Sequence, residues 1–294
     1  MLLALIAVIL EQLLDGLLSG VFVVLIALGL SLIFALGGIV NMAHGALYAI
    51  GAYLAVVLAR HTGFAAAFLA VPVVAALLGL AIERAVFRRE GRREGVPPLL
   101  LTFALALVAE QALGLIFGAS PLPSPTPGVL PGELQLGGIS YPKDRLVVLA
   151  IALVAITLTA LLLYRTPFGR VVRAGAQNPE MVGALGIALA PYRMALAALG
   201  VALAGLAGAL SASIVAIGPA MGQDVLTAAF VVVTIGGIDS FAGLVAAALA
   251  VGLVHGLTAA FEPAASEAAI FILMALALLL RPRGLLGARD GKRA

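Results

Sequence analysis

Long apolar runs recur along the whole chain, and short polar stretches separate them. The runs occupy residues 17–36, 44–59, 66–83, 98–117, 146–164, 194–217, 226–236, 244–260 and 266–280. Several have the roughly 20 residues that an α-helix needs to cross about 30 Å of hydrocarbon. Two short runs, 44–59 and 226–236, adjoin a pair of glycines. The pattern predicts an all-α integral membrane protein, a polytopic helical bundle of about eight to ten transmembrane helices that include broken or half helices.

Composition supports the bilayer as the solvent of this chain. Of the 294 residues, 63% are hydrophobic and 11% are charged, whereas a soluble domain carries about 25% charged residues. We expect Met1–Leu10 to form a short leading helix of the same domain, because it lacks the basic start and the cleavage site of a signal peptide. The chain has no Cys, which excludes disulfides, thiol catalysis and thiolate metal sites.

The basic residues indicate how the chain is oriented in the membrane. Fourteen of the 17 Lys and Arg residues fall in three segments, 84–93, 165–193 and 281–293. Short loops rich in Lys and Arg stay on the cytoplasmic side. These segments, and with them the C-terminus, are therefore predicted to be cytoplasmic. The Pro-rich stretch 118–144 would then form a short cap on the external face.

The longest basic loop contains a helix signal. Asn178 is a suitable N-cap, Pro179 fits the first turn, and Glu180 complements the helix dipole. The helix is predicted to run to about Leu185, with Gly186 at its C-terminal exit. Two interpretations stay open: a capped helix outside the membrane that docks a cytoplasmic partner, or incidental helix in a solvated loop.

Five segments of the chain carry a family resemblance. RVVRAGAQNPEMVGALGI (170–187) resembles the cytoplasmic loop of ABC importer permeases of the branched-chain amino acid type. GIVNMAHGALYAIGAY (38–53) resembles the first signature of the LivH branch of that family more than that of the LivM branch. Segments 82–89, 232–243 and 281–287 also match in order and spacing. The resemblance covers nearly the whole chain.

The resemblance implies an organisation and a set of partners. Residues 1–294 would form a single transmembrane permease domain, and its cytoplasmic loop 165–193 would hold the coupling helix that seats in an ATPase subunit. The implied coupling residues are Arg170, Arg173, Asn178, Pro179, Glu180, Gly183 and Gly186. The implied partners are a second permease subunit (a LivM-like chain or a second copy), two ABC ATPase subunits, and a periplasmic or extracellular solute-binding protein. The chain departs from the family pattern at Met42, where Phe is usual, and at Glu110, where an apolar or amide residue is expected.

The resemblance also implies a function. The chain would be the permease subunit of an ATP-driven ABC importer, passing branched-chain or other hydrophobic amino acids by alternating access. The sequence has no G-x-x-x-x-G-K-[ST] phosphate loop, so we expect no enzymatic activity and no cofactor or metal on this chain. ATP and Mg²⁺ would bind the partner ATPase subunits. The expected location is the inner or plasma membrane of a prokaryote, in contact with membrane lipid and without a nucleic-acid partner.

Other functions stay open from the residues alone. One is an ABC permease for urea or short amides, and another is a secondary transporter or channel that works without ATP. An intramembrane enzyme is disfavoured, because three His and no Cys provide no catalytic or metal-ligand cluster.

The same tripeptide, Gly-Gly-Ile, occurs at 37–39, before the run 44–59, and at 236–238, where the run 226–236 ends. Glycine-interrupted hydrophobic segments in corresponding halves point to a transport site, where helix N-termini meet anionic groups. The predicted pathway or gate residues are Asn41, His44, Gly45, Gly237, Asp239 and Ser240. Asn41, Asp239 and Ser240 are predicted to cap the following helices, and both breaks are predicted to lie near the cytoplasmic face. Alternatively, these polar groups only satisfy the backbone where a helix breaks.

Further polar residues lie within the predicted spans. Glu110 is either a functional group or a carboxylate that pairs with Arg145 or reaches the external interface. His255 faces a vestibule or hydrogen-bonds to a neighbouring helix. Thr102 and Thr234 are predicted to bond to carbonyl groups of their own helices.

Overall fold

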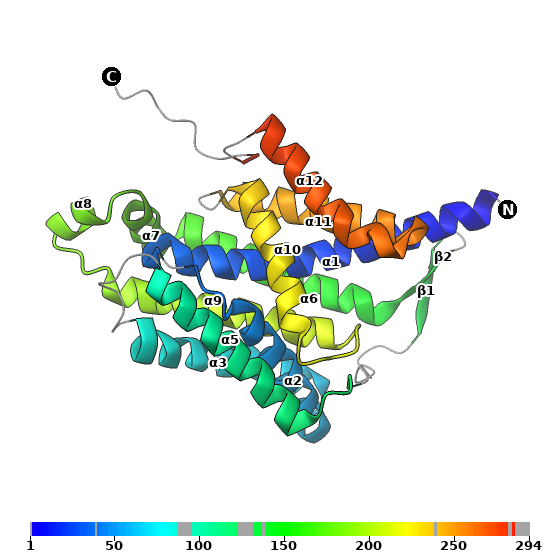
Figure 1. The fold of residues 1–294 in the computed structure, drawn as a ribbon, viewed down its shortest axis with the longest axis horizontal. Helices are drawn as coiled ribbons and strands as arrows, with labels where there is room; N and C mark the ends of the chain where they lie inside the picture. The colour runs from blue at the N-terminus through cyan, green and yellow to red at the C-terminus, as the bar shows by residue number, and fades with distance from the viewer. Residues whose placement is uncertain are drawn as a thin grey trace.

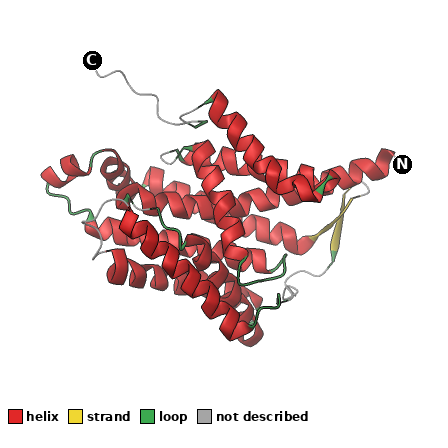
Figure 2. Ribbon diagram, in the orientation of Figure 1, coloured by secondary structure: helices red, strands yellow, loops and turns green. Residues whose placement is uncertain are grey.

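The computed structural model describes residues 2–38, 40–87, 96–122, 132–136, 139–237, 240–281 and 284–285. Helices make up most of this part, and two short paired strands lie at one end of it (Figure 2). Seven helices in the described part are long and apolar enough to cross a membrane. They are α1 (Leu2–Gly37), α3 (Phe64–Ile82), α5 (Val96–Phe117), α6 (Lys143–Arg165), α9 (Ala190–Ala212), α11 (Phe241–Phe261) and α12 (Ser266–Leu280), the last extended by the 3-10 turn η2 (Pro263–Ala265). The predicted all-α polytopic fold is confirmed.

Two further helices belong to the bundle but not to this set of seven. Helix α2 (His44–Thr62) has 19 residues and carries several polar side chains, and α10 (Met221–Gly236) has 16 residues. They correspond to the two short runs of the sequence, although α10 begins at Met221 rather than at residue 226. A five-residue π-helical turn, η1 (Glu83–Phe87), continues α3.

Helix α1 is longer than the sequence pattern predicted. It is continuous over 36 residues, so the separate leading helix expected over Met1–Leu10 is not observed. Glu11, Gln12 and Asp15 interrupt the apolar run without interrupting the helix, because Glu and Gln are good helix formers and no Pro lies among them. The hydropathy pattern therefore predicted a helix boundary near residue 11, whereas the backbone is helical throughout.

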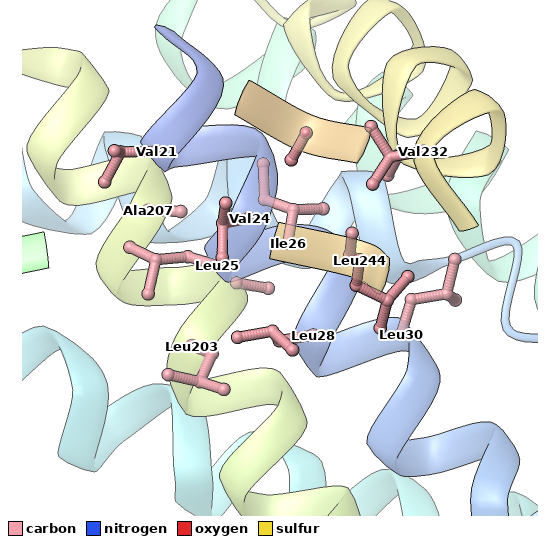
Figure 3. Packing of buried hydrophobic residues seen from close by; sticks show 14 of the residues in the cluster. Val21, Val24, Leu25, Ile26, Leu28, Leu30, Leu203, Ala207, Val232 and Leu244 are labelled. Atoms are coloured by element: carbon pink, nitrogen blue, oxygen red, sulfur yellow. The ribbon is translucent and has the colours of Figure 1, made fainter. Parts of the chain in front are cut away.

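The core of the bundle is built around α1, which packs most extensively against α11 and α9. Figure 3 shows Leu25 and Leu28 of α1 near Leu203 of α9, and Leu30 of α1 near Leu244 of α11. In the spanning parts of α1 and α9, 67% and 72% of the residues are buried, whereas in those of α5 and α12 only 11% and 6% of the residues are buried. The outer helices thus expose their apolar side chains, as expected of a surface that faces lipid or another membrane subunit.

The two ends of the bundle differ (Figure 1). The N-terminus lies at the same end as strands β1 (Glu133–Leu136) and β2 (Ile139–Pro142), which form an antiparallel hairpin. Helices α7 (Pro167–Gln177) and α8 (Pro179–Ala184) lie at the opposite end. The hairpin occupies part of the stretch predicted to form a cap, and residues 123–131 of that stretch lie outside the described residues.

An acidic residue of α1 ties the hairpin to the bundle. Asp15 accepts a hydrogen bond from the Tyr141 hydroxyl (3.1 Å) and forms an ion pair with Arg145. Burial, together with the neighbouring Asp15 carboxylate, raises the pKa of Tyr141 to about 12, so the phenol stays protonated and donates at neutral pH.

Candidate functional site

The first glycine break lets the chain turn back into the bundle. Gly38 has a φ of +63°, and α2 then begins at His44, whose Nε2 atom lies 3.2 Å from the carbonyl oxygen of Ile26. Ile26 lies about three helical turns before the end of α1 at Gly37, which corresponds to about 16 Å along that helix. Helix α2 therefore begins deep inside the bundle. The chain descends between Gly38 and His44 before it becomes helical, so His44 lies inside the bundle, although the glycine break before it lies beside α7. The position of Asn41 and His44 relative to the membrane faces stays a prediction.

The two polar side chains at this break are buried, with Asn41 1% and His44 0% exposed. Because a carbonyl oxygen can only accept, the Nε2 atom of His44 carries a proton and donates it to Ile26. The Asn41 Oδ1 atom accepts from the N–H of Ala43 (3.0 Å), as in an Asx turn. Ala43, not Asn41, occupies the N-cap position of α2. Asn41 therefore does not cap an N–H group of the helix itself, and its side chain instead accepts from the N–H of Ala43, directly before the helix.

Each of these side chains keeps one nitrogen without a partner. Within the described part of the chain, neither Asn41 Nδ2 nor His44 Nδ1 has a hydrogen-bond partner. A buried polar group without a partner costs about 1–3 kcal/mol. Satisfying the backbone at a helix break therefore explains only part of the chemistry of these residues, and their contact with solute stays a prediction.

Helix α5 is fastened to the same break. The N–H of Met42 donates to Thr102 Oγ1 (3.1 Å), and the Thr102 hydroxyl donates to the carbonyl of Leu99 (3.0 Å). The predicted bond of Thr102 within its own helix is confirmed, and so is that of Thr234 to Phe230. The second contact of Thr102 was missed, because it joins residues far apart in the sequence.

Gly45 lies where two helices touch. A Cβ atom added at Gly45 would lie 2.0 Å from the carbonyl oxygen of Gly222 in α10. Gly29 and Gly200 form a similar contact between α1 and α9, where a Cβ at Gly29 would lie 2.5 Å from the Gly200 oxygen and 2.9 Å from His44 Nε2. Small residues allow helix backbones to approach this closely in membranes. The half helix α2 is therefore held by backbone contact on the α10 side, and His44 fills the space beside the other glycine pair.

The second glycine break lies between α10 and α11. Gly237 has a φ of +86° and ends α10, and Ser240 Oγ accepts from the Gly243 N–H (3.0 Å), which confirms Ser240 as the N-cap of α11. Asp239 lies outside the described residues. The ring of Phe241 packs edge-on against Tyr164 at the end of α6 (5.9 Å between centroids). This break therefore lies at the α7–α8 end, and no hydrogen bond or ion pair of the described residues joins it to Asn41 or His44.

The predicted cytoplasmic helix is present with the predicted caps. Asn178 Oδ1 accepts from the Met181 N–H (2.9 Å), and Pro179 starts α8. At the other end, Gly186 has a φ of +80° and donates to Gly183 (2.9 Å), while Ile187 donates to Val182 (3.3 Å). These two bonds form a Schellman motif. Local sequence signals thus predicted both ends of α8 to within a residue.

A preceding helix, α7, was missed. Its signal was present, since Thr166 caps it by accepting from the Gly169 N–H (3.2 Å) and Pro167 starts it. Arg173 of α7 donates to the carbonyl of Leu163 and lies 5.1 Å over the ring of Tyr164. Arg173 therefore fastens α7 to α6, and Arg170, on the same helix, is exposed. A coupling role for either residue stays a prediction.

Helix α8 presents apolar side chains to solvent. Met181 is 58% and Leu185 is 72% exposed, while Val182 is buried against the loop. Glu180 and Gly183 are also exposed. Exposed apolar side chains on a capped helix that is not one of the apolar spans are typical of a surface that contacts a partner.

We expect Asn178→Ala to loosen α8 without unfolding the bundle. Loss of the N-cap hydrogen bond to Met181 costs about 1 kcal/mol of local stability. Hydrogen exchange of the α8 amides should become about fivefold faster, while exchange in α1 stays unchanged. Equal exchange in α8 of both proteins would contradict the capping role.

The structure shows the neighbours of two polar residues of the predicted spans, Glu110 and His255. Glu110 accepts a hydrogen bond from Gln223 of α10, and Arg145 pairs with Asp15. The predicted alternative in which Glu110 pairs with Arg145 was therefore wrong, because a carboxylate of α1 lies closer. His255 lines a cavity of about 360 Å³ together with Asp224 and Glu267.

Comparison with known proteins places the chain in a family. Residues 12–280 match the family model described as the branched-chain amino acid transport system / permease component. The high-affinity branched-chain amino acid transport system permease protein BraD of Pseudomonas aeruginosa is 30% identical, and the alignment covers 95% of both chains. The permease protein LivH of Escherichia coli is 26% identical, again over 95% of both. A probable branched-chain amino acid transport permease protein LivH of Methanocaldococcus jannaschii is 27% identical over 90% of this chain and 88% of its own.

No solved structure matches the chain significantly. The family match spans all seven apolar helices and both glycine breaks, and its relatives are aligned over nearly their full length. The chain is a multi-pass membrane protein that belongs to the family of permease components of branched-chain amino acid transport systems.

Proposed function

We propose that this chain is the membrane-spanning subunit of an ATP-driven importer for branched-chain or other hydrophobic amino acids. Its relatives are named as permeases of branched-chain amino acid transport systems. The observation that carries the proposal is α8, a capped helix outside the membrane whose apolar side chains Met181 and Leu185 are exposed. Because this chain has no phosphate loop, an ATP-driven importer needs a separate ATPase subunit. We take α8 as the helix to which that subunit binds.

The α7–α8 end is the cytoplasmic end in this proposal. Two contacts bring the basic segments together there. Glu83 at the end of α3 pairs with Arg193 at the start of α9 (2.7 Å). Leu285, which follows α12, donates to the carbonyl of Ile235 at the end of α10 (2.7 Å). Basic residues concentrate on the cytoplasmic side of membrane proteins, so the hairpin and the N-terminus are external and the C-terminus is cytoplasmic.

The loop is built to transmit a displacement of α8 into the bundle. Arg173 ties α7 to the end of α6, and a Cβ added at Gly175 of α7 would lie 2.9 Å from side-chain atoms of Leu36 and of Leu189. Leu36 directly precedes the Gly37-Gly38 break that leads into α2. Movement of α8 by an ATPase subunit would therefore reach the first glycine break through packed side chains, without crossing the lipid phase.

Alternating access follows from this connection. ATP and Mg²⁺ bind the two partner ATPase subunits, whose closure moves α7 and α8 and changes the position of α2 relative to α10. A second permease subunit completes the pathway, and an external solute-binding protein delivers the amino acid at the hairpin end. Asn41, His44, Gly45, Gly237, Asp239 and Ser240 are the proposed gate residues, since they lie at the two places where the bundle helices are interrupted.

The test is purification of the tagged chain from native membranes, followed by uptake assays in liposomes. We expect ATPase subunits and a second permease to co-purify, and leucine uptake to require ATP and the solute-binding protein. Purification of this chain alone, with uptake that needs no ATP, would establish a secondary carrier or channel instead. Uptake of urea or short amides in preference to leucine would correct the solute.

A further inference from the structure

A groove with polar residues opens on the side of the bundle formed by α2, α5 and α10. It has a volume of about 160 Å³, and its walls include Met42, Phe103, Leu107, Glu110, Gln223 and Phe230. Glu110 lies about two helical turns before the end of α5 at Phe117, or about 10 Å inside the span. The groove is therefore within the membrane and is not part of the external hairpin.

The polar side chains of this groove are unsuited to lipid. Gln223 and Thr227 are exposed and Glu110 is half-buried on the surface of the single chain. A carboxylate within the hydrocarbon region costs several kcal/mol unless it meets water or a partner, and such residues mark solute pathways. Leu115, also on α5, is 88% exposed, and its apolar side chain needs neither water nor a polar partner. The side of α5 and α10 that bears Glu110 and Gln223 therefore faces an aqueous pathway.

Among the described residues that line the groove, none carries a positive charge. Its carboxylate accepts a hydrogen bond from the Gln223 amide, while the ion pairs among the described residues join Arg145 with Asp15 and Arg193 with Glu83. Asp224, the next residue of α10, lies within electrostatic range of Glu110. The local field is thus negative, and it favours a cationic group from the solute.

The rest of the groove suits the remainder of an aliphatic amino acid. The side chains of Phe103, Leu107 and Phe230 form an apolar wall. Met42 and Ala46 place the first turn of α2 at the rim, where the positive end of the helix dipole favours a carboxylate. A zwitterion with a branched aliphatic side chain matches all three surfaces.

We propose that this groove is a solute-binding site of the pathway. The Glu110 carboxylate and the Gln223 carbonyl oxygen accept hydrogen bonds from the α-ammonium group, and the apolar wall contacts the aliphatic side chain. The proposal rests on the transport function proposed above and adds the residues that recognise the solute. It also gives a reason for the carboxylate at Glu110.

The experiment uses a single reporter cysteine. The chain has no Cys, and the Thr227 hydroxyl donates to the Gln223 carbonyl of its own helix, so Thr227→Cys leaves the contacts between helices intact. The variant is assembled with its permease and ATPase partners in cysteine-free form and is treated in detergent with a cationic, water-soluble methanethiosulfonate. Leu115→Cys on α5 is the matched control, because its exposed side chain faces lipid.

We expect Thr227→Cys to react and Leu115→Cys to stay unreacted. Leucine should slow the reaction of Thr227→Cys, while isocaproate, which has the same carbon skeleton without the ammonium group, should not. In the Glu110→Gln background, half-protection should require at least about tenfold more leucine, since hydrogen bonds to charged groups have this effect. Glu110→Asp should restore part of the protection.

Several outcomes would overturn the site. They are an unreactive Thr227→Cys, equal protection by leucine and isocaproate, or unchanged protection in Glu110→Gln. Thermal unfolding reports whether Glu110→Gln keeps its fold, and Gln223→Ala provides a second variant with the same expected loss of protection. ATP-driven leucine uptake by the unmodified complex is measured in parallel. Its failure would refute the transport function, whereas its success with unchanged protection would refute only this site.

Discussion

Gly45→Ala is expected to destabilise the permease by at least about 3 kcal/mol, the upper part of the range for overpacking a core. The added Cβ would lie 2.0 Å from the Gly222 carbonyl oxygen, and its other close neighbours include the Gly222 carbonyl carbon. Backbone atoms of two packed helices cannot move aside as a flexible side chain does. The helices α2 and α10 would therefore have to move apart at the start of α2. Thermal unfolding of the purified protein measures the effect.

Gly114→Ala is the matched control for this prediction. Gly114 lies within α5, and the nearest atom to a Cβ added there is Pro219 Cγ at 4.0 Å, an ordinary contact. Because Ala favours a helix over Gly by about 1 kcal/mol, this variant should be unchanged or slightly more stable. A midpoint for Gly45→Ala equal to that of Gly114→Ala would show that α2 and α10 are not held by backbone contact.

Replacement of Met181 and Leu185 together by Asp is expected to uncouple transport from ATP hydrolysis. Both side chains are exposed, so the permease should fold and unfold as before. Two charges placed in the apolar contact with an ATPase subunit should lower leucine uptake by at least about tenfold, as loss of interface hot spots does. Co-purification of the ATPase subunits and ATP-dependent uptake measure the result.

The control for this variant is Leu134→Asp in the hairpin strand β1, where an exposed apolar side chain lies at the opposite end of the bundle. Co-purification of the ATPase subunits with this control should stay within about twofold of that with the unmodified complex. Full activity of the double variant in an assembled complex would contradict the assignment of α8 as the docking helix.

The parts of the fold that were predicted correctly are those with local causes. The apolar runs became helices because their own backbone bonds satisfy every polar group that lipid cannot. Both ends of α8 followed from Asn178, Pro179 and Gly186, whose effects extend over one helical turn. Helix α7 carried an equally local signal in Thr166 and Pro167, so the sequence was sufficient to predict this helix as well.

Contacts between residues far apart in the sequence could not be predicted from local sequence signals. The partner of Asp15, Arg145, follows far along the chain. The pairing of Glu110 with Gln223, rather than with Arg145, depends on which helices are neighbours. Hydropathy treats each such residue as an interruption, whereas the structure uses it as a contact.

The sequence by itself determined that this protein is a polytopic helical membrane protein, where most of its membrane helices lie, and which loop presents a capped helix. These properties depend on composition and on interactions within about one helical turn. Only the tertiary structure decided that α2 begins beside Ile26 in the middle of the bundle, that Gly45 touches Gly222, and that Glu110 faces a groove. Glycine, Asn and His at a break are compatible with a turn at the membrane surface or deep within it. The choice between them depends on how closely the surrounding helices pack, and no stretch of sequence contains that distance.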